Sequence, residues 1–137
     1  MSFITTKGVY GLSAMYELTQ GDGVTPMQIK NIAQKAGIPF NYLEQLLNQL
    51  RRAGLINSIR GAKGGYVLAR TPDRILIYDI LVALEGELAF AEYSLENRIL
   101  DMFFKDTQKS IEELLKIPLS EFQKYENILL DGLTYSI

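Results

Sequence analysis

Apolar residues recur with helical spacing along most of the chain, and short turn signals separate the runs. Residues 7–20 carry Val9, Leu12, Met15 and Tyr16 on one side, which predicts a first helix ending at the glycines of GDG. The next segment, TPMQ at residues 25–28, has Thr25 and Gln28 at the spacing of a capping box with proline between them. A second helix is therefore expected to begin there and to close at Gly37.

A third helix is predicted directly behind the second, beginning between Pro39 and Asn41. One face of it is apolar at i, i+3, i+4 and i+7, with Leu43, Leu46, Leu47 and Leu50. The opposite face is polar and carries Asn41, Glu44, Gln45, Asn48 and Arg52. Two amphipathic helices joined by a turn of about four residues containing glycine are typical of a helix-turn-helix.

A basic hairpin is predicted after the third helix. The segments LINSI and YVLA alternate as strands, and RGAKGG turns between them. A hairpin in this place is typical of the wing of a winged helix-turn-helix. The turn matches neither G-x-x-x-x-G-K-[ST] nor G-x-G-x-x-G and lies between two strands, which disfavours a nucleotide-binding loop. Its glycines instead allow the backbone to turn and to approach a duplex closely.

The C-terminal half predicts three more helices. Ile77, Ile80, Leu81 and Leu84 indicate one that closes at Gly86, and Ser120 with Gln123 suggests a capping box for the last. Between them, residues 94–116 predict a longer helix with an apolar stripe, made of Ile99, Met102, Phe103, Ile111, Leu114 and Leu115. The expected fold is mainly α with a small β-hairpin wing: a winged helix-turn-helix DNA-binding domain over residues 1–86 and a helical dimerisation or regulatory region over residues 87–137.

The long helix has no obvious partner inside a small winged-helix domain. Its stripe is expected to pack against the same stripe of a second copy, which gives a two-fold homodimer. The alternative is that the helix folds back on its own domain.

The composition removes most kinds of enzyme chemistry. The chain contains no cysteine and no histidine, so it cannot form a Ser-His-Asp triad, an imidazole or thiolate metal site, or an iron–sulfur cluster held by its own thiolates. We expect no cofactor and no enzymatic activity. No apolar run reaches the roughly 18 to 20 residues that span a bilayer, and the first residues lack the regions of a signal peptide. We therefore expect a cytoplasmic protein that does not bind membranes.

Charge is distributed unevenly along the chain. Up to Arg74 there are nine basic and four acidic residues, and after it five basic and twelve acidic ones. This asymmetry indicates a basic half that faces a polyanion.

Double-stranded DNA is the polyanion that these residues suit best. Arg51, Arg52, Arg60 and Lys63 are the predicted phosphate contacts, with Lys7 and Lys30 as further candidates. Asn41, Gln45 and Asn48 can pair with adenine, and Glu44 can accept from cytosine. The alternative is a winged-helix module that does not bind DNA and docks an acidic protein through the same surface.

Three stretches carry a resemblance to a known family: TTKGVYGLSAM, IAQKAGIPFNYLEQLLNQLRRAGLINSIRGAKGGYVLAR and YDILVALEG. They resemble the Rrf-two family of bacterial winged-helix regulators over about residues 5–86. The resemblance implies a dimeric repressor or activator whose recognition helix enters the major groove and whose wing follows the minor groove. It further implies that Tyr42 and Leu43 seat the recognition helix, that Arg60 enters the minor groove, and that Lys7 and Tyr10 approach phosphates.

The chain departs from part of this family in one respect. Family members that sense iron–sulfur status or nitric oxide place three cysteines after the segment matching ALEG, and this chain has none. It looks more like the cysteine-free type that represses cysteine metabolism (the CymR type). That resemblance implies cysteine synthase as a partner, with Ile137 as a C-terminal anchor in the enzyme's active site. The alternative is that Ile137 only frays or packs locally.

Overall fold

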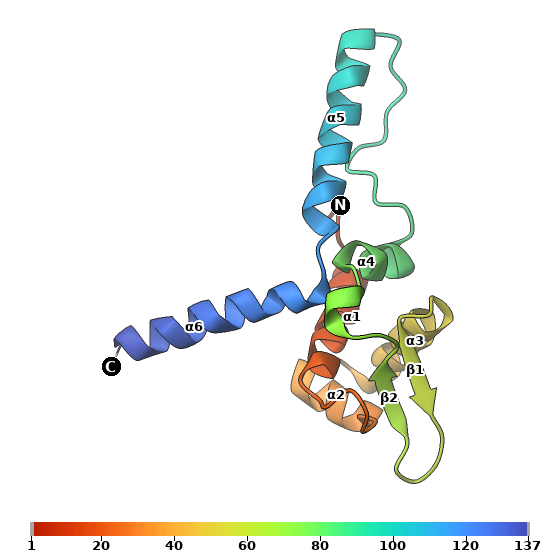
Figure 1. Ribbon diagram of the computed structural model, residues 1–137. Coiled ribbons are helices and arrows are strands. Elements are labelled where there is room, and N and C mark those ends of the chain that lie inside the picture. The colour runs from red at the N-terminus through yellow and green to blue at the C-terminus, as the bar shows by residue number, and fades with distance from the viewer. Residues whose placement is uncertain (1, 137) are drawn as a thin grey trace.

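The computed structural model describes residues 2–136, and the side chains of residues 2–132 (Figure 1). Within this part, six α-helices, two short 3-10 turns and one hairpin follow each other along the chain. They are α1 (Thr6–Thr19), α2 (Ile29–Ala36), α3 (Phe40–Arg52), β1 (Ile56–Ile59), β2 (Gly65–Leu68), η1 (Pro72–Arg74), α4 (Ile77–Glu85), α5 (Arg98–Leu115), η2 (Leu119–Glu121) and α6 (Phe122–Ser136). The predicted winged helix-turn-helix, mainly helical, is confirmed.

Helices α1 to α4 share one apolar core. The four leucines predicted on the inner face of α3 are each no more than 1% exposed. They meet Met15 of α1, Ile32 of α2 and Ile80 of α4, which are fully buried. Helix α2 closes at Gly37 with a left-handed φ of 68°, as predicted, and α3 begins three residues later.

Helices α1 and α4 lie unusually close together. A Cβ atom placed on Gly11 would lie 2.0 Å from Cδ1 of Leu84, so only glycine leaves room for that leucine. At one end of the contact, the Glu85 carboxylate accepts hydrogen bonds from the Thr5 backbone N–H and from its hydroxyl, the latter at 2.6 Å. Glu85 thereby satisfies a free N–H at the start of α1.

The wing is a two-stranded antiparallel hairpin that a third segment joins. Ile56 pairs with Leu68, and Ile59 with Gly65. Beside β2, Met27 forms an isolated bridge with Tyr66, with both backbone hydrogen bonds at 2.9 Å. The chain before α2 is therefore part of the wing's sheet.

This bridge explains why the predicted capping box at Thr25 and Gln28 is wrong. Helix α2 begins only at Ile29, because Met27 must stay extended to pair with Tyr66. The Thr25 hydroxyl donates to Asp22 at 2.7 Å and caps no helix.

Helix α5 starts later than residue 94, where the pattern placed it. The Asn97 side chain accepts from the N–H groups of Ile99 at 3.0 Å and Leu100 at 3.2 Å, which makes Asn97 the N-cap. The chain before it instead runs alongside the helix (Figure 1).

After α5 the chain returns to the body before α6 leaves it. Leu119 is 1% exposed, and its N–H donates to the Ile75 carbonyl at 2.8 Å. This anchor forms the η2 turn and moves the start of α6 to Phe122, so the predicted capping box of Ser120 and Gln123 is wrong. Helix α6 then projects away from the body (Figure 1). No helix within residues 2–136 is both long and apolar enough to cross a membrane.

Candidate nucleic-acid interface

The outer face of α3 is polar and open. Asn41, Glu44 and Gln45 are exposed along its first half, whereas Asn48 is partly buried. Asn48 accepts a hydrogen bond from Arg51 at 2.7 Å, so this pair is organised before any ligand arrives. Amide and carboxylate groups on an open helix face are the groups that read base edges in a major groove.

A hollow of about 590 Å³ separates the start of α3 from the wing. Two of the predicted cations line it, although they are far apart in the sequence: Lys30 of α2, and Arg60, which directly follows β1. Three residues that were not predicted to contact DNA line it as well: Gln28, Phe40 and Ser58. The hollow is thus a groove with cations from two separate parts of the chain, next to the first residue of α3.

The orientation of the wing relative to α2 depends on Gly65. Its φ is 155°, and a Cβ atom there would lie 2.4 Å from the Met27 carbonyl oxygen. No other residue would leave space for the bridge between Met27 and Tyr66. Across the same seam, the Gln28 amide lies 3.5 Å from the Ala62 carbonyl. The wing turn is therefore held at a set distance from α2.

Helix α1 contributes a second side to this surface. The rings of Tyr10 and Tyr42 meet edge to face with centroids 5.8 Å apart. This contact joins α1 to the first turn of α3 and brings Tyr10, predicted to approach phosphates, against Tyr42, predicted to seat the recognition helix. Lys7, predicted for the same role, is partly buried one turn before Tyr10.

The other predicted cations do not line the hollow. Arg51 and Arg52 are exposed in the last turn of α3, and Lys63 is exposed in the wing turn. Two ion pairs are found among the described residues: Lys105 with Asp101 on α5, and Lys124 of α6 with Glu121 of η2. The cations of this face therefore remain free to meet an external anion.

The residues that sequence reasoning missed come from the joins between elements. Gln28 and Ser58 enter the hollow because Met27 and β1 flank the same strand, and Phe40, which is 46% exposed, begins α3 beside them. Phe40 is a large aromatic residue at the start of α3 that is exposed instead of packed in the core. Exposed apolar surface of this kind often marks a binding site.

The stripe predicted on α5 is largely open in the single chain. The exposed fractions are 77% for Ile99, 65% for Met102, 59% for Phe103 and 73% for Leu114. Ile111 is partly buried, and Leu115 packs against the chain's own core. Ile137, the predicted anchor, lies outside the described residues.

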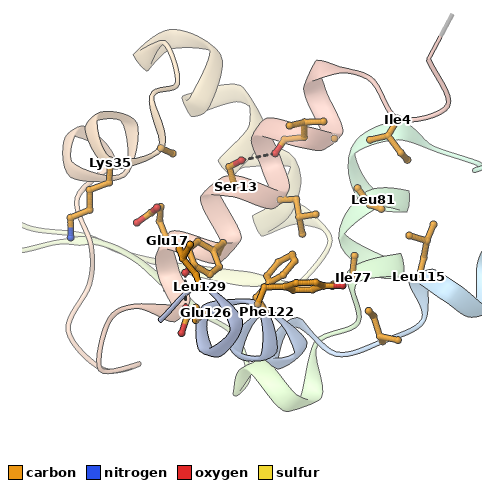
Figure 2. A pocket seen from close by; sticks show the side chains of 17 residues that line it. Ile4, Ser13, Glu17, Lys35, Ile77, Leu81, Leu115, Phe122, Glu126 and Leu129 are labelled. Carbon is orange, nitrogen blue, oxygen red and sulfur yellow. Dashed lines mark hydrogen bonds between the residues drawn. The ribbon is translucent and has the colours of Figure 1, made fainter. Parts of the chain in front are cut away.

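A separate groove of about 780 Å³ lies where α6 leaves the body (Figure 2). Its lining is mostly apolar and comes from α1, α4, the end of α5 and α6. The Tyr16 hydroxyl donates to Glu126 at 2.5 Å at this groove, and this hydrogen bond raises the pKa of Tyr16 above its ordinary value. The groove has no cationic side chain other than Lys35, so it does not suit a polyanion.

Comparisons with known proteins place this architecture among transcriptional regulators. The profile of the Rrf2 family, described as "Iron-dependent Transcriptional regulator", matches residues 4–125. The HTH-type transcriptional regulator CymR of Bacillus subtilis is 51% identical over 89 residues, which are 65% of this chain and 64% of that protein.

Solved structures agree. The structure of CymR (YrzC), the global cysteine regulator of B. subtilis, superposes with a TM-score of 0.81 at 39% identity, covering 91% of this chain and 98% of that one. An IscR from T. potens superposes with a TM-score of 0.75 at 41% identity, covering 90% and 87%.

The iron in the family's description does not fit the donors of this chain. Its sequence offers no cysteine or histidine, and no group of three or more carboxylates gathers around a common point in the part that the structure describes. The segment between α4 and α5 is held by an amide side chain and aromatic rings, and it faces two lysines of α5, Lys105 and Lys109. A thiolate-held cluster has no ligands here.

Proposed function

Because the chain belongs to the Rrf2 family of transcriptional regulators, we propose that it binds specific DNA sequences with α3 in the major groove and the wing along the minor groove. The observation that carries this proposal is the hollow at the start of α3, which Lys30 and Arg60 line together with Phe40. A phosphate backbone that follows the hollow would bring base edges to α3 and leave the wing turn beside the next groove. A regulator of this kind acts on chromosomal DNA, so we place it in the cytoplasm.

The proposed division of labour follows the chemistry of each side chain. Asn41, Glu44, Gln45 and Asn48 read bases, and Arg60 enters the minor groove. Tyr42 seats the recognition helix. The remaining predicted residues position the backbone of the DNA: Lys7, Tyr10, Lys30, Arg51, Arg52 and Lys63.

We propose that the active species is a homodimer joined through the stripe on α5. Four large apolar side chains that are each more than half exposed would be costly to leave in water, and a second copy of the same stripe covers them with matching chemistry. A two-fold dimer would read a pseudo-palindromic operator with half-sites about 34 to 36 Å apart.

The biological role is proposed by similarity to CymR. We propose repression of genes of sulfur or cysteine metabolism, with the signal arriving through a partner protein or a small effector. Cysteine synthase is the proposed partner, with the Ile137 carboxylate seated in its active site. A chain lacking Ile137 should lose a complex with cysteine synthase in size-exclusion chromatography and keep its affinity for DNA. Equal complex formation by the two chains would reject the anchor.

The DNA-binding proposal is tested by selection of genomic fragments on the purified protein, followed by titration of the selected site at several salt concentrations. The logarithm of the affinity should fall linearly with the logarithm of the salt concentration, with a slope near −0.9 for each neutralised phosphate. No affinity for DNA at all would favour the module that docks an acidic protein, and the same affinity for scrambled DNA would contradict sequence-specific binding.

A further inference from the structure

A small open cavity lies between α5 and the segment that joins α4 to α5. Residues 87–97 leave α4 and run along the side of α5 (Figure 1). Between them lies a hollow of about 320 Å³. This volume is at the lower end of the range for ligand sites, which suits a small metabolite.

The walls of the cavity are fixed by one amide side chain. Gln108 of α5 donates to the Leu88 carbonyl at 2.5 Å and accepts from the Phe90 N–H at 2.9 Å. It thereby satisfies the segment's backbone as a neighbouring strand would. Leu88 is 3% exposed, and the Tyr93 ring stacks on Phe104 at 4.8 Å. A cavity held in this way needs little reorganisation to accept a ligand.

Charges of both signs line the cavity without neutralising each other. Lys105 is bound to Asp101 at 2.9 Å, and Glu112 accepts from the Gln108 amide at 3.2 Å. Lys109 on α5 and Glu87 on the facing segment form no ion pair within 4.0 Å, with each other or with any other described residue. An ammonium group and a carboxylate are thus both available in one hollow.

We propose that this cavity binds a small free α-amino acid. The carboxylate of the zwitterion meets Lys109 and its ammonium group meets Glu87, with Ala89 and Ala91 leaving room for a short side chain. Each of these contacts is a charge-assisted hydrogen bond. Because carboxylates and lysines both line the cavity, it does not suit a ligand of a single charge. The carboxylates repel an inorganic anion, and the lysines repel a metal cation.

The cavity lies on the segment that leads from α4 into α5, so an amino acid bound there touches both this connecting segment and the proposed dimer helix. Its use as a regulatory signal rests on the proposed function. Binding itself does not, because it can be measured without DNA.

The test is titration of the full chain with glycine, L-alanine, L-serine and L-cysteine, followed by NMR at the Ala89 and Ala91 amides and by calorimetry. At least one of the four should bind and shift these amides. Propionate and ethylamine, which each carry half of the zwitterion of alanine, should bind at least about tenfold more weakly than the best ligand. No binding by any of the four amino acids, or equal binding of propionate, would overturn the proposal.

Two variants locate the site. Lys109→Gln and Glu87→Gln should each weaken binding of the best amino acid by about tenfold or more, since each leaves one charge of the ligand without its partner. Lys124→Gln, on α6 outside the cavity, should leave it unchanged. Unaltered far-UV circular dichroism shows that the variants fold. Binding that survives both substitutions would place the ligand elsewhere and reject this cavity.

Discussion

Arg60 lies at the junction of β1 and the wing turn, where its side chain is exposed and lines the hollow beside α3. We expect Arg60→Ala to weaken binding to the selected operator by about 1 to 3 kcal/mol, because the substitution removes both a charge and a contact inside the groove. Fluorescence anisotropy at fixed salt measures this loss.

Lys124→Ala is the matched control for Arg60, since it removes an exposed cation from α6 and not from the wing. Its operator affinity should equal that of the unchanged chain. If Arg60→Ala also binds with unchanged affinity, the proposed minor-groove contact is wrong.

Asp22 orders the loop before α2 through its ionised form. Hydrogen bonds from the Thr25 backbone and hydroxyl, and then from the Val24 backbone, lower its pKa from 3.8 to about 2. A lowered pKa means that the carboxylate stabilises the fold above pH 3.8 and loses this effect as the pH falls toward 2.

We therefore expect Asp22→Ala to lower the unfolding midpoint at pH 6, and the difference from the unchanged chain to shrink as acid is added. Urea denaturation at a series of pH values measures this difference, and NMR titration gives the carboxyl pKa directly. A pKa near 3.8 would contradict the assigned hydrogen bonds.

At the scale of elements, the contact between α1 and α4 depends on the missing side chain of Gly11. Gly11→Ala forces a methyl group into the space of Leu84, which is itself 3% exposed and cannot move into solvent. We expect a loss of about 1 to 3 kcal/mol in the free energy of unfolding.

Gly132→Ala is the control for this substitution. Gly132 also lies in a helix, but a Cβ atom there meets nothing within 4 Å, so alanine should stabilise α6 by up to about 1 kcal/mol. Urea denaturation of both variants separates helix propensity from packing. Equal stabilisation by the two substitutions would show that α1 and α4 do not pack this closely.

Helix α5 is the element on which the proposed dimer depends. Phe103→Glu places a carboxylate in the centre of the apolar stripe, where Phe103 is 59% exposed in the single chain. Burying an unpaired charge in the interface is costly, so light scattering should report monomers.

Lys109→Glu changes a charge on the same helix, but on the side that faces residues 87–93, and should leave the dimer intact. A dimer that persists in Phe103→Glu would contradict the proposed interface.

At the scale of the whole molecule, helical spacing predicted the first five helices, because the core determines where apolar residues must lie; the sixth was predicted from its start alone. Leu43, Leu46, Leu47 and Leu50 all face inward as their spacing required. The starts of α2, α5 and α6 were predicted less well. The start of α5 is determined locally, by the cap at Asn97. The other two starts depend on contacts between segments distant in the sequence: the bridge of Met27 to Tyr66 for α2, and the hydrogen bond of Leu119 to Ile75 for α6.

The candidate interface shows the same limit. The polar face of α3 and the basic turn of the wing are visible in the sequence, because each lies within one short segment. Gln28 and Ser58 were missed because they approach each other only through the pairing of Met27 with Tyr66, and no local pattern indicates that pairing.

The part of the chain that contains α5 leaves the body after the last turn of α4. It returns to the body at the first turn of α4, where the Ile77 N–H donates a hydrogen bond to the Ile117 carbonyl. Helix α5 can therefore change in length without moving the residues that hold the body together. Its 18 residues span about 27 Å at ~1.5 Å each. In the proposed dimer the length of this helix sets the distance between the two recognition helices. An α5 longer by two turns would move each recognition helix outward by about 10 Å and select operators with more base pairs between their halves.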